Sequence, residues 1–268
     1  MGHLQVIGMQ KPLLLLLSAG CLISCHKEAS SPANNWTWFG TNNSAVYNYV
    51  LINANQVVSS TDTDEFHIGV SAAFIDSSNH QVTVVHALSV NNQIIQPGLD
   101  STYSFNYGSF GSMESGYQLF GTQVMVTIRG MGEGDTVSRS IYLPKRLNNL
   151  ISNYPDTVSL NRGLQLNWSP DPENTWGNVI IQLFYYNTLS RKSDSTLPEK
   201  ISTVNLTVQD NGNYFLSQND LRVFPGHAFI GITIARGTQN EAILPLSRKR
   251  VYYFSSSSVS TPPVRLTQ

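Results

Sequence analysis

The stretch Leu164-Gln165-Leu166-Asn167-Trp168 alternates apolar and polar side chains and is followed directly by Ser169-Pro170. A period of two residues is typical of a β-strand with one buried face. Similar short segments lie on both sides of it, separated by Gly, Asn, Asp and Ser, whereas helical periodicity is nearly absent. The sequence therefore predicts an all-β protein.

The predicted strands form two groups along the chain. The first group covers residues 46–53, 66–75, 81–90, 102–107, 123–129 and 137–143. The second group covers residues 157–160, 164–168, 179–186, 202–208, 213–216, 228–235 and 250–254. Because a run of adjacent hairpins is typical of an antiparallel sandwich, we expect two consecutive antiparallel β-sandwich domains.

Composition limits the classes of partner. The chain has 268 residues, 41% of them hydrophobic, which suffices for two domains of roughly 100 residues each. Lys plus Arg (16) nearly cancels Asp plus Glu (17), and the compact basic run Arg248-Lys249-Arg250 is short. Because binding through phosphate contacts needs several cations spread over a face, we expect a solvated strand end there and no nucleic-acid partner.

The amino terminus has the pattern of an export signal. Lys11 precedes an apolar run over residues 13–23, about half of the ~20 residues that a membrane-spanning helix needs. Translation from Met9 would give a compact signal peptide. Both cysteines, Cys21 and Cys25, lie at the end of this run, so no disulfide framework is expected in the mature chain.

The segment Leu22-Ile23-Ser24-Cys25 resembles the lipobox of bacterial lipoproteins. The resemblance implies a signal peptide over residues 1–24 and acylation of Cys25, with membrane attachment in the cell envelope, on the outer membrane, at its periplasmic or surface face. Cys21 is the alternative acylation site, although Ser18 then stands where that family has a leucine-like residue. The small polar segment 25–35 is predicted to be a flexible tether.

The limits of the domains follow from breaks in the strand pattern. An N-terminal sandwich is expected over residues 36–146 and a linker over 147–156. A second sandwich is expected over 157–254. The serine run and the Pro262-Pro263 pair predict a disordered tail over 255–268.

The second group of strands resembles fibronectin type III and related immunoglobulin-like modules. Leu164-Gln165-Leu166-Asn167-Trp168-Ser169-Pro170 is similar to that family's second strand, and the resemblance implies an inward Trp168 between the two sheets. Ile181-Gln182-Leu183-Phe184-Tyr185 resembles the third strand. Phe229 stands where the family has the tyrosine of its tyrosine corner, so that hydrogen bond is not expected here.

No catalytic or metal motif has the required spacing, and no cofactor is expected. His67 and His86 lie in predicted strands that a hairpin would bring together, but a zinc site needs a third ligand. The acidic segment Asp62-Thr63-Asp64-Glu65 lacks the glycine and ligand alternation of a calcium loop. We therefore expect surface histidines and a solvated acidic loop.

Trp176 lies in the predicted loop 174–178 and is the candidate ligand-binding residue, because exposed aromatic rings stack on sugars. We expect a non-enzymatic binding or scaffolding protein of the cell envelope, with a polysaccharide as partner beside an outer-membrane importer. One alternative is a structural or adhesive protein that pairs with another envelope protein. A second is a hydrolase that assembles its carboxylates from distant loops.

Overall fold

The computed structural model describes residues 48–57, 65–76, 81–99, 101–106, 118–130, 134–147 and 155–268. Strands make up most of these residues, so the predicted all-β fold is confirmed. The predicted signal peptide, Cys21, Cys25 and the tether lie outside the described residues.

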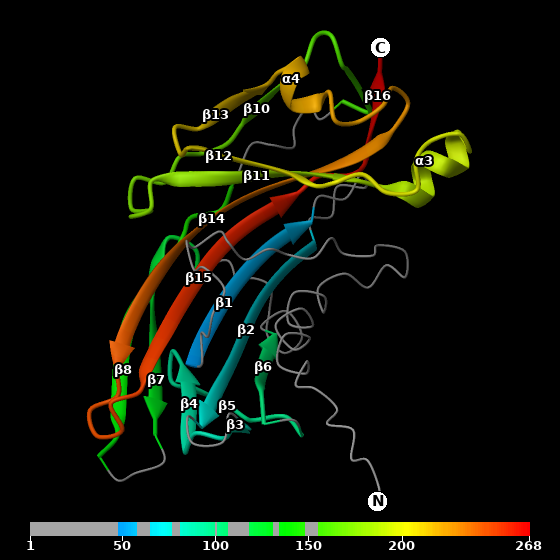
Figure 1. Cartoon of the computed structure of the whole chain (residues 1–268). Helices are drawn as coiled ribbons and strands as arrows, with labels where there is room; N and C mark the ends of the chain where they lie inside the picture. Colours follow the sequence, from blue (N-terminus) through cyan, green and yellow to red (C-terminus); the bar gives the residue numbers. More distant parts are fainter. Residues whose placement is uncertain are drawn as a thin grey trace, which may run out of the picture.

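The described elements are listed here in chain order (Figure 1). The strands are β1 (Asn48–Val57), β2 (Glu65–Asp76), β3 (Gln81–Thr83), β4 (Ala87–Val90), β5 (Gln93–Ile95), β6 (Tyr103–Asn106), β7 (Thr122–Arg129), β8 (Thr136–Leu143), β9 (Thr157–Ser159), β10 (Leu164–Asn167), β11 (Asn178–Tyr185), β12 (Val204–Gln209), β13 (Asn213–Leu216), β14 (Phe229–Ile243), β15 (Arg250–Ser260) and β16 (Val264–Thr267). The helices of the described part are α3 (Asn187–Ser193) and α4 (Gln218–Leu221).

One long sheet runs through the molecule. Within the described residues it has ten strands, with the main order β12-β11-β14-β15-β1-β2-β3. Strands β14 and β15 are its longest antiparallel pair in register, from Thr233 opposite Ser260 to Ile243 opposite Arg250. Both extend from the end that carries the C-terminus toward the opposite end (Figure 1).

The first described strand lies beside the last long strand. Strand β1 pairs in parallel with β15, Tyr49 opposite Tyr252, and antiparallel with β2. A parallel neighbour needs a long connection, and here more than two thirds of the chain separates the two strands, from Val57 to Arg250. The central strand pair of the sheet therefore forms only when residues from both ends of the described chain have come together.

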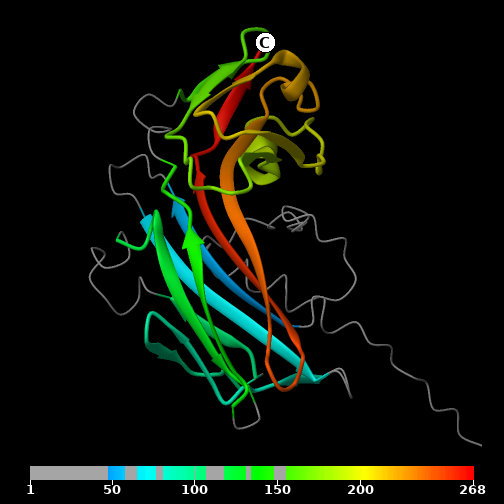
Figure 2. The same cartoon turned by 90° about the vertical axis from the view of Figure 1, so that its left-hand side faces the viewer.

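A smaller sheet packs on one half of the long sheet and forms the first core. This sheet has the order β5-β4-β7-β8, and Figure 2 shows its strands beside the lower half of the long sheet. On β7, Val124, Val126 and Ile128 are fully buried and alternate with more exposed residues. They join Val50 and Ile52 of β1 in one apolar cluster, as the period of two requires.

The second core lies at the other half of the long sheet. Strands β10 and β13 form a two-stranded sheet, Leu164 opposite Leu216. Leu166, Trp168 and Leu216 are buried with Ile181 and Ile232 of the long sheet. Trp168 therefore fills the interior between two sheets, which is the place that the resemblance of its strand implied.

The two cores do not follow the predicted division at residues 147–156. Ala242, Leu244, Val251 and Tyr253 fall within the predicted second domain, yet their side chains belong to the first core. The physical reason is strand length, because β14 and β15 are too long to end within one core. The first core is thus completed by residues from the far end of the chain.

The prediction of a disordered tail over 255–268 is wrong. Residues up to Ser260 belong to β15, and β16 follows, with Val264 and Leu266 buried in the second core. The serines are small enough to lie between sheets, and their hydroxyls find partners: the Ser256 hydroxyl donates to Asn53 Oδ1 at 2.8 Å. Composition alone indicated disorder because it ignores these partners.

The Asp210-Asn211-Gly212-Asn213 segment connects two strands that belong to different sheets. The strands on either side of it pair with different partners, β12 with β11 and β13 with β10. Gly212 does have a positive φ of 90°. A Cβ there would lie 2.9 Å from the Trp168 carbonyl oxygen, so glycine permits a crossover from one sheet to the other.

Candidate functional site

The turn that carries Trp176 is fixed by backbone and amide hydrogen bonds. The Gly177 N–H donates to the Asn174 carbonyl at 2.8 Å, and Gly177 has a φ of 67°. The Asn174 side chain donates to the Asn178 carbonyl, and the Asn178 side chain donates to the Trp176 carbonyl. The Trp176 side chain itself is half-buried. The turn therefore presents part of an indole ring from a rigid support.

Beneath this turn lies a buried ion pair between Arg236 of β14 and Asp210. The Arg236 side chain is fully buried, and its Nη1 donates to Asp210 Oδ2 at 2.7 Å. Its Nη2 donates to the carbonyls of Ser169 and Arg146, at 2.7 and 3.1 Å. A buried charge is tolerated when it is paired and hydrogen-bonded, as the two terminal nitrogens of this guanidinium are.

The Asp210 carboxylate accepts hydrogen bonds from side chains of the second core. Its Oδ1 accepts the indole N–H of Trp168 at 2.8 Å, and its Oδ2 lies 3.5 Å from Asn174 Nδ2. The indole N–H thus has the partner that a buried tryptophan needs. The Trp176 turn, the Trp168 strand and β14 are tied together at a single carboxylate.

A second buried carboxylate, Asp171, joins the two cores. The hydroxyl of Tyr142, on β8, lies 2.9 and 3.0 Å from its two oxygens and donates to it, and the Lys145 N–H donates to Oδ2 at 2.8 Å. Burial, and then this hydrogen bond, raises the pKa of Tyr142 well above its usual value. The phenol therefore stays protonated and remains a donor at physiological pH.

We name these groups the polar junction: Tyr142, Asp171, Trp168, Asn174, Asp210 and Arg236. Its two carboxylates accept hydrogen bonds from buried or backbone donors. Hydrogen bonds of this kind hold the surrounding loops and strands in fixed positions. The geometry indicates a joint between the cores that supports the Trp176 turn.

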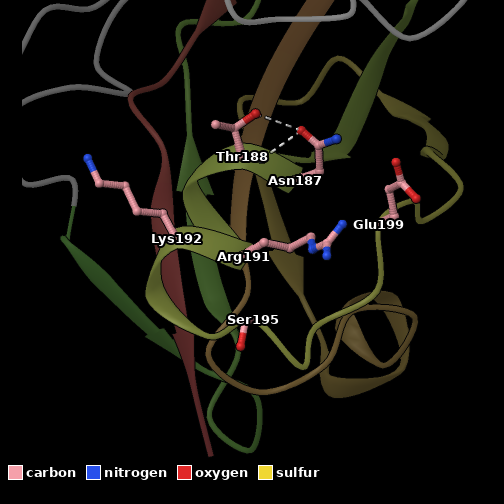
Figure 3. Close-up of a pocket in the computed structure, with 6 residues that line it drawn as sticks. All are labelled: Asn187, Thr188, Arg191, Lys192, Ser195 and Glu199. Carbon is pink, nitrogen blue, oxygen red and sulfur yellow. Dashed lines mark hydrogen bonds between the residues drawn. The ribbon is translucent and has the colours of Figure 1, made fainter.

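A separate polar hollow lies beside α3 (Figure 3). It has a volume of about 380 Å³ and is lined by Asn187, Thr188, Arg191, Lys192, Ser195 and Glu199. The Tyr185 hydroxyl donates to the Pro198 carbonyl and so fixes the segment that bears Glu199. Two cations, one carboxylate and three neutral polar groups suit hydrogen bonding to a polar ligand.

The turn after α3 is stabilised by Asp194. The Thr196 hydroxyl and N–H both donate to Asp194 Oδ1, at 2.6 and 3.0 Å. These hydrogen bonds, the hydroxyl first, lower the pKa of the Asp194 carboxyl. The rim of the hollow that contains Ser195 is held in this way.

Of the metal-site candidates, the structure gives the backbone positions of His67 and His86. His67 lies on β2 opposite Asn55, and His86 is exposed before β4. Among the described residues, no group of three His, Cys, Asp or Glu side chains could hold a metal ion. Asp62, Thr63 and Asp64 lie outside the described residues.

Sequence reasoning missed the polar junction. The sequence pattern indicated no shared role for Asp171, Asp210 and Arg236. One signal was present: Arg236 follows the largely apolar run 228–235, and a cation that continues a buried strand is seldom found without a partner. The identity of that partner depends on the tertiary fold.

No protein-family model matches the chain, and no curated protein matches its sequence. No helix in the described part is both long and apolar enough to cross a membrane.

The polar junction predicts a large and asymmetric effect of mutation. Asp210→Asn leaves Arg236 buried without its counter-charge, so the free energy of unfolding should fall by roughly 3–5 kcal/mol. Urea denaturation followed by circular dichroism measures this. The control is Glu241→Gln, in the ion pair with Arg250 whose side chains are 53% and 54% exposed, where little change is expected. Equal effects of the two substitutions would contradict a stabilising junction.

Proposed function

We propose that this protein is a lipid-anchored, non-enzymatic binding or scaffolding protein of the bacterial cell envelope, acylated at Cys25. The observation that supports it best is the arrangement of the long sheet. The described chain enters at one end, where the Asn48 side chain donates to the Arg250 carbonyl at 3.0 Å. The Trp176 turn, α3 and α4 are carried by the half that contains the second core (Figure 1).

This arrangement supports different roles for the two ends, membrane attachment at one and partner binding at the other. Cys25 precedes Asn48 by 23 residues, so an anchor at Cys25 is connected to the first-core end. Strands β14 and β15 pass through both cores, so the second core is held away from that end by continuous hydrogen-bonded structure. In the proposal, the first core faces the membrane and the second core meets the partner.

The chemistry of the second core favours a carbohydrate partner. A half-buried indole on a fixed turn can stack on a sugar ring, and the hollow beside α3 offers amide, hydroxyl and charged groups for sugar hydroxyls. Asp171 and Asp210 both hold buried donors, which favours binding over hydrolysis. Capture of a polysaccharide beside an outer-membrane importer is the specific form of the proposal.

One feature favours the alternative of a structural or adhesive protein. Strand β12 pairs only with β11 among the described strands and forms one edge of the main order of the long sheet. Unpaired N–H and carbonyl groups at such an edge can accept a strand from another protein. In this alternative the partner is an envelope protein.

The anchor is tested by metabolic labelling with a clickable fatty acid. We expect label on the wild-type protein and on Cys21→Ala, and none on Cys25→Ala, because only the Cys25 thiol would be acylated. In-gel fluorescence of the immunoprecipitated protein reads the result. Label that persists in Cys25→Ala, or that is absent from the wild type, would contradict the anchor.

The partner is tested by affinity electrophoresis of the protein in gels that contain polysaccharides. Trp176→Ala should abolish a retardation seen for the wild type, and Trp176→Phe should restore part of it, because a phenyl ring can still stack. Phe215→Ala is the matched control, since Phe215 is a 51% exposed aromatic residue elsewhere on the second core.

Retardation that is unaffected by Trp176→Ala would contradict a sugar site at this turn. Absence of any retardation, together with recovery of one specific envelope protein after crosslinking in cells, would support the strand-pairing alternative.

A further inference from the structure

The turn between β14 and β15 combines exposed apolar and cationic side chains. We call residues 243–250, Ile-Leu-Pro-Leu-Ser-Arg-Lys-Arg, the basic tip. Ile243 and Leu246 are 50% and 63% exposed, and the segment contains three cations and no acidic residue. Large exposed apolar side chains beside clustered cations are uncommon on a surface that meets only water.

The backbone of the basic tip is held by hydrogen bonds to Asp135 and by a buried leucine. Asp135 Oδ1 accepts the N–H groups of Leu246 and Ser247, at 3.0 and 3.4 Å. The Leu244 N–H donates to the Lys249 carbonyl, and the Leu244 side chain is buried in the first core. The exposed position of Leu246 is therefore imposed by its neighbours and is not the loose end of a hairpin.

The Asp135 carboxyl stays ionised under the basic tip. Desolvation by burial raises its pKa, but hydrogen bonds from Ser247 and Leu246, with the nearby charge of Lys249, outweigh this and lower the pKa overall. Asp135 is buried, so its charge faces the turn backbone and not the outer surface. Glu241 is ion-paired with Arg250 at 3.4 Å. Of the tip cations, Arg248 has no ion pair among the described residues.

The basic tip lies at the end where the described chain begins. Tyr49 of β1 is opposite Tyr252 of β15, two residues beyond the tip. Exposed Arg129, at the last position of β7, lies at the same end. It is opposite Thr136, and the neighbouring Asp135 accepts a hydrogen bond from Leu246 of the tip. An anchor upstream of Asn48 is therefore connected to the molecule at this basic, apolar end.

We propose that the basic tip docks on an acidic phospholipid surface, with Leu246 entering the interface and Arg248 and Lys249 facing the headgroup phosphates. The inference rests on the proposed lipid anchor for its orientation, although the contact is a separate, reversible one. Cations that flank an apolar side chain match the boundary between anionic headgroups and acyl chains. A nucleic acid would need cations over a broader face and offers no place for Leu246.

The test is co-sedimentation with vesicles, using the mature chain from residue 25 with Cys25→Ser so that no acyl group contributes. The probes are vesicles of mixed phosphatidylglycerol and phosphatidylcholine, and vesicles of phosphatidylcholine alone. We expect binding to the acidic vesicles only, and weaker binding as salt is raised. Circular dichroism of each variant confirms that it is folded.

Two variants separate the charge from the apolar contribution. Arg248→Gln with Lys249→Gln should weaken binding to acidic vesicles by roughly ten- to thirtyfold, since each cation near such a surface contributes several-fold in affinity. Leu246→Ser should weaken it by about fivefold or more through loss of the buried side chain. Arg222→Gln with Arg265→Gln makes the same charge change at exposed positions of the second core and should leave binding unchanged.

The inference is overturned by equal binding to both kinds of vesicle, by equal losses in the tip and control variants, or by DNA competing as well as acidic vesicles do. Its failure is distinct from failure of the anchor. Vesicle binding by this unacylated chain tests the tip without the anchor, whereas fatty-acid labelling tests Cys25 without the tip.

Discussion

The structure depends on the hydrogen-bonded pairing of β14 and β15, two strands that are too long to belong to one core. Their register runs from Thr233 opposite Ser260 to Ile243 opposite Arg250. One end of the pair contributes Ile234 and Val259 to the second core, and the other contributes Ala242 and Val251 to the first. Because both cores pack on the same two strands, neither has a complete interior without residues that are close to the C-terminus.

The place where the cores meet is polar, and this follows from the same constraint. A strand that passes from one core to another crosses a region where loops from both sides converge, and their carbonyl groups need donors. Arg236 supplies two of these donors to Ser169 and Arg146 and is neutralised by Asp210. Removal of either charge alone would leave the other one buried without a partner, whereas replacement of both members of a buried pair by apolar residues is often neutral or stabilising. We infer that the ion pair selects one relative position of the loops, including the turn that bears Trp176.

Local sequence patterns predicted the features that depend on neighbouring residues in the chain, such as strand positions. Alternation of apolar residues located most strands. The inward position of Trp168 was implied by the resemblance of its strand to the second strand of fibronectin type III modules, and its side chain is buried in the second core. The serine run at 255–258 was misassigned because its order comes from neighbours, Asn53 on β1 among them, that lie far away in the sequence. Asp171 and Asp210 look like ordinary loop carboxylates until the fold brings Tyr142 and Arg236 to them. The candidate Trp176 could be named from sequence, whereas the support beneath it could not.

The central claim is that the two cores form one cooperative unit through β14 and β15. Native-state hydrogen exchange in increasing urea tests it, by comparing the slowest amides of β7 in the first core with those of β11 in the second. The account predicts that both sets reach one opening free energy with one urea dependence, because neither core survives loss of the shared strands. Opening of one set at a clearly lower free energy, with a smaller urea dependence, would show that the cores unfold separately and would contradict the account.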